Sequence, residues 1–265
     1  MTVALKKARE AIGGAARERP WVPPMTVEER ITNTLIPAPL YWRIRAYRGL
    51  LKGEPELRLL RYLVDPDKTS VDGGANKGVY TYFLSKLSRH VYAYEPNPKI
   101  FDILRRSVTR PNVTLSPAAL SDVSGEDRLI VPKGKAGYSN QRGSLRKDNL
   151  TGAHGEVIVT TRRLDDEDVG RVGFLKIDVE GFEKNVIRGA EETIRAYRPV
   201  LLVEIEEFHT HEPIEETLDF VRGHGYGGLF LAQGRIHALE HFDPVRHHRE
   251  PARGAYVYNF IFLPD

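Results

Sequence analysis

The sequence contains no cysteine, which excludes disulfide bonds, thiolate metal ligands and cysteine nucleophiles. It also has no apolar run of the length that a membrane-spanning helix needs. The basic start with Lys6, Lys7 and Arg9 leads to Gly13-Gly14, without the apolar stretch of a secretory signal. We therefore expect a cytoplasmic protein with no transmembrane segment.

Composition is ordinary for a globular protein of 265 residues, with 41% hydrophobic and 28% charged residues. The positive charge is uneven, because the first 61 residues hold 12 Lys or Arg against 6 Asp or Glu. We interpret this excess as a solvated helical surface, with contact to an acidic partner or a membrane surface as the alternative. No basic stripe interleaved with aromatic residues is evident, so no nucleic-acid partner is expected.

Prolines divide residues 1–66 into short segments, which we predict to be an N-terminal helical cap. Residues 67–265 alternate strands with helices, the pattern of a mostly parallel α/β sheet. The expected helices are 27–33, 41–50, 56–63, 77–87, 98–107, 182–197 and 214–224. The expected strands are 69–72, 90–95, 113–119, 174–178 and 199–206, with 228–232, 235–239 and 256–263 closing the sheet in antiparallel fashion.

Residues 132–156 form the least regular stretch, with five glycines and several Lys and Arg residues. A loop this long inside a domain is uncommon unless it has a function or is disordered. A substrate-facing lid and a surface insertion are both consistent with it.

The most informative motif follows the first predicted strand. It reads D-x-G-x-N-x-G and comprises Asp72, Gly73, Gly74, Ala75, Asn76 and Gly78. Glu95-Pro96-Asn97 ends the next predicted strand, 23 residues after Asp72, and a carboxylate at that spacing suits a ribose. The dinucleotide pattern G-x-G-x-x-G is absent, and Asp72 would repel a phosphate. These motifs are better explained by a site for S-adenosylmethionine, which has ammonium and sulfonium charges, than by a turn without a ligand.

A second group of ionisable residues follows two later strands. Lys176, Asp178 and Glu180 alternate at the end of one strand, so they are expected to share a face. Glu204, Glu206 and His209 follow the next strand. His209 is a candidate general base. Asp178, Glu204 or Glu206, and His209 could instead bind a divalent cation such as Mg²⁺. The alternative is that His209 makes only a structural hydrogen bond.

Several segments together resemble the FkbM-type S-adenosylmethionine-dependent methyltransferases. They are VDGGANKGVYT, AYEPNP, AALSD, FLKIDVEGFEKNVIRGA and RPVLLVEIEE, and the resemblance runs from about residue 69 to residue 206. It implies an α/β class I methyltransferase (Rossmann-like) fold, with a mostly parallel seven-stranded sheet flanked by helices. It also implies O-methylation of a small-molecule hydroxyl on a sugar, a glycolipid or a polyketide-like natural product.

The resemblance also implies roles for particular residues. Asp178, Glu180 and His209 form the expected catalytic group, and no dedicated metal ligands are assigned. The expected cofactor-binding residues are Asp72, Gly73, Gly74, Ala75, Asn76, Gly78, Tyr80, Glu95, Pro96, Asn97, Ala119, Leu120 and Asp178. Gly73 and Lys77 depart from the family's usual residues. An RNA or protein methyltransferase, a non-catalytic binding module and a homo-oligomer stay open as alternatives.

Overall fold

The computed structural model describes residues 21–134, 137–138, 143–145, 153–252 and 256–265. The first 20 residues of the predicted N-terminal cap and about half of the predicted loop 132–156 lie outside this part. The helices are α2 (Val27–Leu35), α3 (Ala38–Lys52), η1 (Pro55–Arg58), α4 (Leu60–Leu63), α5 (Val79–Leu87), α6 (Pro98–Ser107), η3 (Leu164–Asp166), α7 (Glu183–Arg188), α8 (Glu191–Tyr197), α9 (Glu207–Thr210), α10 (Ile214–Arg222), η4 (Leu239–His241) and η5 (Val245–Arg249). The strands are β1 (Thr69–Gly73), β2 (His90–Tyr94), β3 (Val113–Ser116), β4 (Ala118–Leu120), β5 (Gly125–Gly134), β6 (Gly137–Tyr138), β7 (His154–Arg162), β8 (Val172–Ile177), β9 (Val200–Glu204), β10 (Tyr226–Ala232), β11 (Arg235–Ala238) and β12 (Asn259–Pro264).

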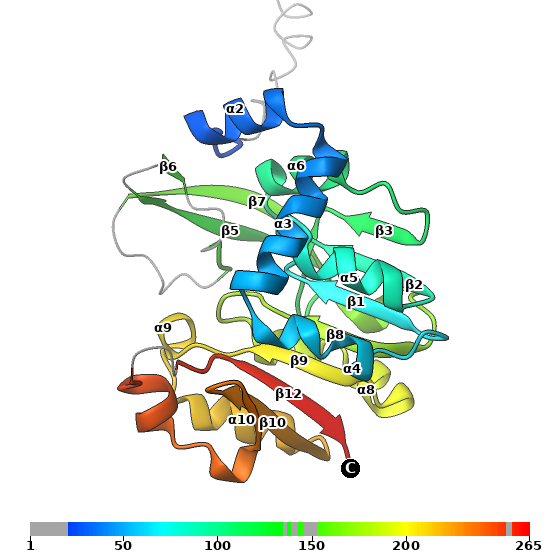
Figure 1. The fold of residues 1–265 in the computed structure, drawn as a ribbon, viewed down its shortest axis with the longest axis vertical. Helices are drawn as coiled ribbons and strands as arrows, with labels where there is room; N and C mark the ends of the chain where they lie inside the picture. Colours follow the sequence, from blue (N-terminus) through cyan, green and yellow to red (C-terminus); the bar gives the residue numbers. More distant parts are fainter. Residues whose placement is uncertain (1–20, 135–136, 139–142, 146–152, 253–255) are drawn as a thin grey trace, which may run out of the picture.

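The main sheet has the order β11-β10-β12-β9-β8-β1-β2-β3 (Figure 1). The five strands from β9 to β3 are parallel, and the other three pair antiparallel, as predicted. The sheet has eight strands, one more than the family resemblance implied, and the segment 235–239 predicted from the sequence corresponds to the edge strand β11. Strand order reverses between β1 and β8, and in open α/β sheets ligands bind at the carboxyl ends beside such a reversal.

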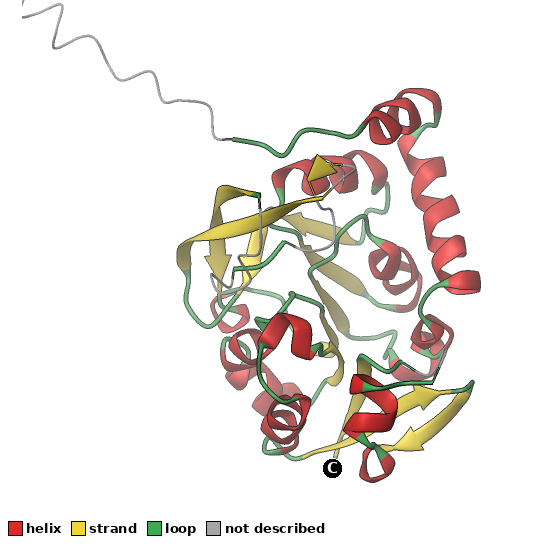
Figure 2. Ribbon diagram, turned by 90° about the vertical axis from the view of Figure 1, so that its left-hand side faces the viewer, coloured by secondary structure: helices red, strands yellow, loops and turns green. Residues whose placement is uncertain are grey.

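Helices cover both faces of this sheet (Figure 2). The larger core, on one face, buries Val186 and Ile187 of α7, Ile194 of α8 and Leu218 of α10. The other face packs against η1, α4 and α5, in a core that contains Leu57, Leu60 and Leu84. These apolar faces hold the strands in place, so that polar residues can occupy the carboxyl edge of the sheet.

Two of the elements predicted as continuous are each divided into two in the structure. The single strand expected over 113–119 is two strands in different sheets, since Pro117 has no N–H to continue the pairing. Ser116 pairs with Tyr94 of the main sheet, whereas Ala118 pairs with Thr160 of β7. The helix expected over 182–197 is interrupted between α7 and α8. At this break a Cβ on Gly189 would lie 2.0 Å from the carbonyl oxygen of Ser121, so the close approach requires glycine.

The second sheet, in the order β4-β7-β5-β6, stands beside the carboxyl edge of the main sheet (Figure 1). Its inner face has its own small core, which includes Leu129, Val131, Leu145, Val157 and Val159. Strands β5 and β7 run well into the stretch that was predicted to be an irregular loop. Much of the described part of that stretch is therefore regular β-structure.

The N-terminal helices pack against the α/β domain. Helix α3 lies along α5 and α6 (Figure 1). The indole Nε1 of Trp42, buried in α3, donates a hydrogen bond of 2.6 Å to the carbonyl oxygen of Gly78. The predicted cap is thus attached directly to the glycine motif that follows β1. Within the described residues, no helix is long and apolar enough to span a membrane.

Candidate active site

A cavity of about 640 Å³ opens at the carboxyl edge of the sheet. It is bounded by the loops that follow β1, β2, β8 and β9, by β4, by α3 and by the inner face of the second sheet. The cavity therefore lies where the strand order predicts a ligand.

The loop after β1 forms one wall of the cavity. Asp72 is buried and accepts a hydrogen bond of 2.5 Å from the Thr81 hydroxyl. Burial raises the pKa of Asp72, and the positive charge of Lys176 opposes this shift. Gly74 has a φ of +77°, and a Cβ there would lie 1.8 Å from the carbonyl oxygen of Asp178. Only glycine permits this contact between the loops after β1 and β8.

Glu95 ends β2 and lies beside the same loop. Its two carboxylate oxygens accept hydrogen bonds of 2.8 Å from the backbone N–H groups of Asn76 and Asn97. Burial raises the pKa of Glu95 to about 7, although both hydrogen bonds lower it. The carboxylate is thus fixed in orientation, and each oxygen keeps a second lone pair for a ligand in the cavity.

Lys176 and Asp178 form an ion pair of 2.7 Å at the end of β8. The Lys176 ammonium also lies 4.6 Å from the centre of the Tyr80 ring. Burial lowers the pKa of Lys176, but the carboxylates of Asp178 and Asp72 outweigh it and raise the pKa overall. Lys176 therefore stays charged and holds Asp178 at the cavity wall.

Glu180 and Glu206 both approach Nε2 of His209, at 2.6 Å and 3.3 Å. Burial lowers the pKa of His209, but the two carboxylates outweigh it and raise the pKa to about 9. His209 is therefore an imidazolium at neutral pH, which is unlike the free base that its sequence position suggested. Strand β8 ends at Ile177 and Glu180 has a φ of +53°, so Glu180 does not continue the predicted alternation of the strand.

The magnesium alternative finds no support in the donor geometry. Among the residues that the structure describes, no group of three or more His, Asp or Glu side chains is placed to hold a metal ion. Asp178 is paired with Lys176, and His209 is paired with two carboxylates. These donors are engaged by protein cations, so the arrangement does not fit a divalent metal site.

Most of the predicted site residues line the cavity. They are Asp72, Gly74, Ala75, Asn76, Tyr80, Glu95, Pro96, Asn97, Ala119, Leu120, Asp178, Glu180 and His209. Gly73 and Gly78 do not line it. Gly73 packs near Leu120, and Gly78 begins α5 with a φ of +77° beneath Trp42. Both shape the loop without facing the cavity.

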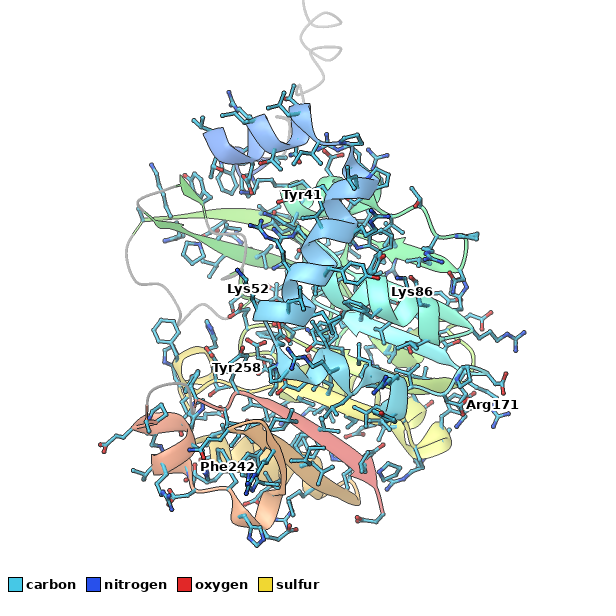
Figure 3. The ribbon with its side chains drawn as sticks, in the orientation of Figure 1. Tyr41, Lys52, Lys86, Arg171, Phe242 and Tyr258 are labelled. Carbon is cyan, nitrogen blue, oxygen red and sulfur yellow. The ribbon has the colours of Figure 1, made fainter. Side chains whose placement is uncertain are left out.

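Sequence reasoning missed several lining residues that come from distant segments. Arg45 and Glu54 belong to the N-terminal cap, and Tyr256 and Tyr258 precede β12. Tyr258 lies where the chain enters β12, below the end of α3 (Figure 3). No local pattern marks these residues, because only the packing of the cap and of β12 against the sheet brings them to the cavity.

Part of the predicted lid also reaches the cavity. Gly143 and Leu145 line it, and the Ser144 hydroxyl donates a hydrogen bond of 2.6 Å to the carbonyl oxygen of Glu180. The backbone of Ser144 also pairs with Ile130 of β5. These contacts attach the described residues 143–145 to the acidic end of the site, and the lid role stays a prediction.

The strand order, the antiparallel closing strands and the cavity beside the strand reversal define a protein with the class I methyltransferase fold. The family model described as the methyltransferase FkbM domain matches residues 72–227. The chain belongs to this family, as the sequence motifs predicted.

Two curated relatives are similar to the chain at modest identity. The hexuronic acid methyltransferase AglP of Haloferax volcanii is 28% identical over 167 residues, which cover 61% of this chain and 64% of the relative. The 31-O-demethyl-FK506 methyltransferase FkbM of Streptomyces tacrolimicus is 27% identical over 219 residues, or 71% of this chain and 80% of the relative. The chain thus spans slightly less than two thirds of AglP. Among solved structures, a methyltransferase FkbM from Methylobacillus flagellatus has a TM-score of 0.48 and 14% identity, over 88% of this chain and 60% of that one.

Proposed function

We propose that this protein is an S-adenosylmethionine-dependent O-methyltransferase that acts on a hydroxyl group of a small molecule. One observation carries the proposal. A single cavity is lined both by the glycine loop with Glu95 and by Asp178, Glu180 and His209. Cofactor-binding chemistry and proton-accepting chemistry therefore face the same space, as methyl transfer requires.

The residues at one end of the cavity fit the cofactor. Gly74 lets the loop after β1 pack against the loop after β8, and Asp72 together with Asp178 makes this wall acidic, which suits an ammonium and a sulfonium. The Glu95 oxygens are positioned to accept hydrogen bonds from both ribose hydroxyls. Ala119 and Leu120 supply an apolar wall for the adenine. When bound, S-adenosylmethionine supplies an electrophilic methyl group.

The residues at the other end orient the acceptor and take up its proton. Asp178 is held by Lys176 and can accept a hydrogen bond from the acceptor hydroxyl. Burial raises the pKa of Glu180, which makes this carboxylate a stronger base than one in water. The proton that the acceptor hydroxyl loses would pass to Glu180. His209, as an imidazolium, holds Glu180 in place and is a positioning residue in this scheme.

The charge of the acceptor end supports a small, non-phosphate acceptor. Glu54, Glu204 and Glu206 line the cavity together with Asp178 and Glu180. Such a surface would repel the phosphates of RNA, and nucleic-acid binding depends on favourable phosphate contacts. The names of the two relatives specify a hexuronic acid and an oxygen-linked position of FK506. The FK506 position is consistent with a hydroxyl acceptor on a polyketide-like compound, and the hexuronic acid is consistent with an acceptor of the sugar class.

The proposal is tested by methyl transfer from radiolabelled S-adenosylmethionine to a panel of small hydroxyl compounds, including sugars, uronic acids and macrolides. A structured RNA and a mixture of peptides without histidine are tested as alternative acceptors. We expect label in a small compound and none in RNA or peptide. Label in RNA alone would contradict the proposed acceptor class, and an Asp178→Ala variant with full turnover would remove Asp178 from the mechanism.

A further inference from the structure

Arg45 is a cavity residue whose charge the proposed mechanism does not use. It lies on α3, one helical turn after Trp42, whose hydrogen bond to Gly78 fixes α3 against the glycine loop. Its Nη1 donates a hydrogen bond of 3.2 Å to the Tyr41 hydroxyl, in the first turn of α3 (Figure 3). Its Nε is buried and has no hydrogen-bond partner among the described residues. Because this nitrogen is buried, an anion in the cavity would act on the guanidinium through its charge and its other N–H groups.

Arg45 belongs to a group with more positive than negative charge. The ammonium groups of Lys77 and Lys99 share one carboxylate, that of Glu29, at 3.3 Å and 3.4 Å. Burial lowers the pKa of Lys77, and the nearby guanidinium of Arg45 lowers it further, whereas Glu29 raises it. Two ammonium groups therefore share one carboxylate, and the Arg45 guanidinium adds a third positive charge close to Lys77. Both Arg45 and Lys77 line the cavity, so their excess charge faces a bound molecule.

The rest of the cavity has the opposite charge. Asp72, Glu95, Asp178, Glu180, Glu204 and Glu206 all line it. Lys176 and His209, two further cations that line the cavity, are each paired with carboxylates of this wall. A carboxylate on a bound molecule would therefore be attracted most at the Arg45 and Lys77 end. S-adenosylmethionine has a matching asymmetry, because its one anionic group is the carboxylate of its amino acid end.

We infer that Arg45 and Lys77 form the binding site for the amino acid carboxylate of the cofactor, with the Arg45 guanidinium as the main donor. The inference rests on the proposed function and extends it. It assigns a cofactor-binding role to the N-terminal cap, which lies outside the segment matched by the family model. It also gives a role to Lys77, whose charge the proposed mechanism does not use.

The experiment compares two ligands that differ only at this end. S-adenosylhomocysteine contains the amino acid carboxylate, whereas 5′-methylthioadenosine has the same adenosine and thioether without it. Both are titrated calorimetrically into the wild-type chain and into Arg45→Met, Arg45→Lys and Lys77→Met. In Arg45→Met we expect the Kd for S-adenosylhomocysteine to rise about tenfold or more, because a charge-assisted pair is lost. The Kd for 5′-methylthioadenosine should change less than about twofold, and Arg45→Lys should lie between the wild type and Arg45→Met.

The matched control is Arg43→Met, an exposed arginine on the same helix, which should leave both affinities unchanged. Equal weakening of both ligands in Arg45→Met would overturn the inference and indicate a structural role. Unchanged affinity for both would overturn it as well. Free glucuronate is also titrated into the wild-type chain and into Arg45→Met, each saturated with S-adenosylhomocysteine. If Arg45→Met weakens the binding of glucuronate alone, Arg45 binds a carboxylate of the acceptor and the inference fails. A wild-type chain that binds neither nucleoside would instead refute the proposed function, and this inference with it.

Discussion

Nε2 of His209 lies 2.6 Å from Oε2 of Glu180, and this contact joins the loop after β8 to the helix after β9. Glu206 approaches the same nitrogen at 3.3 Å. Because two carboxylates surround one imidazole, the ring is charged at neutral pH and the trio has a net negative charge. The imidazolium of His209 thus holds the Glu180 carboxylate at the cavity and neutralises part of the negative charge of the two glutamates.

The raised pKa of His209 predicts a stability that depends on pH. The pKa is about 9 in the folded chain and 6.5 for an ordinary histidine, so the folded state binds this proton more tightly. The stabilisation is complete below about pH 6.5 and is lost as the pH rises through about 9. This contribution to the free energy of unfolding is at most roughly 3 kcal/mol. Urea unfolding should show His209→Gln destabilised more at pH 6 than at pH 9.5.

The comparison between variant and wild type at each pH cancels the other groups that titrate in this range, such as Glu56 and Glu183. A direct check is the NMR titration of the His209 ring. An equal loss of stability at both pH values, or a ring that titrates near pH 6.5, would be inconsistent with the ion pairs.

Glu95 predicts a cofactor affinity that depends on pH. Burial raises its pKa to about 7, and only the carboxylate form accepts hydrogen bonds from both ribose hydroxyls. The affinity for S-adenosylhomocysteine should therefore fall as the pH drops from 8 to 6. In Glu95→Gln the affinity should be weaker by about tenfold or more at pH 8 and nearly constant over the range. Glu126→Gln, an exposed carboxylate on β5, is the control and should behave like the wild type. A wild-type affinity that is flat from pH 6 to 8 would argue against a ribose contact at Glu95.

Gly74 and Gly234 provide a matched test of the loop geometry. Their φ values are +77° and +75°, so alanine strains the backbone at both positions. At Gly234 an added Cβ meets no atom within 4 Å, whereas at Gly74 it would lie 1.8 Å from the Asp178 carbonyl oxygen. We expect Gly234→Ala to lower the free energy of unfolding by about 1 kcal/mol. Gly74→Ala should lower it by roughly 3 kcal/mol or more and abolish the binding of S-adenosylhomocysteine. Equal effects in urea unfolding would mean that the two loops do not meet as described.

Glu180→Gln separates proton transfer from binding. The amide keeps the size of the side chain but cannot take up the hydroxyl proton, and the Ser144 hydroxyl contacts only the backbone oxygen of residue 180. Turnover should fall about 100-fold, while the affinity for S-adenosylhomocysteine stays within about threefold of the wild type. Glu216→Gln, an exposed position on α10, should have no effect on either quantity. Full turnover in Glu180→Gln would transfer the proton-accepting role to another group.

The strands and glycine loop could be predicted from sequence because their determinants are local. Helix α6 begins and ends at the predicted residues, since Pro98 and the Asn97 cap define its start. The motif at Asp72 and the carboxylate at Glu95 follow adjacent parallel strands, so topology alone brings them to one edge. The catalytic candidates Asp178 and Glu180 follow β8, beside β1, for the same reason.

The remainder of the site depends on packing that no short pattern encodes. Arg45 reaches the cavity because Trp42 fixes α3 on Gly78, a contact between residues 36 positions apart. The charge of His209 depends on Glu180 and Glu206 converging on one nitrogen, and the sequence places only Glu206 nearby. His248, which lies between charged residues in the sequence, is buried and accepts a hydrogen bond from the backbone N–H of Glu207 at Nε2. Each of these outcomes is set by tertiary contacts that outweigh the local environment.

The central claim is that the cavity beside β1 binds S-adenosylmethionine with Glu95 at the ribose. The most direct measurement is calorimetric titration of the wild-type chain and Glu95→Gln with S-adenosylhomocysteine at pH 8. Our account predicts one site per chain with a Kd in the micromolar range, and a clear loss of affinity in the variant. Absence of binding to the wild-type chain, or equal affinity in both chains, would contradict it.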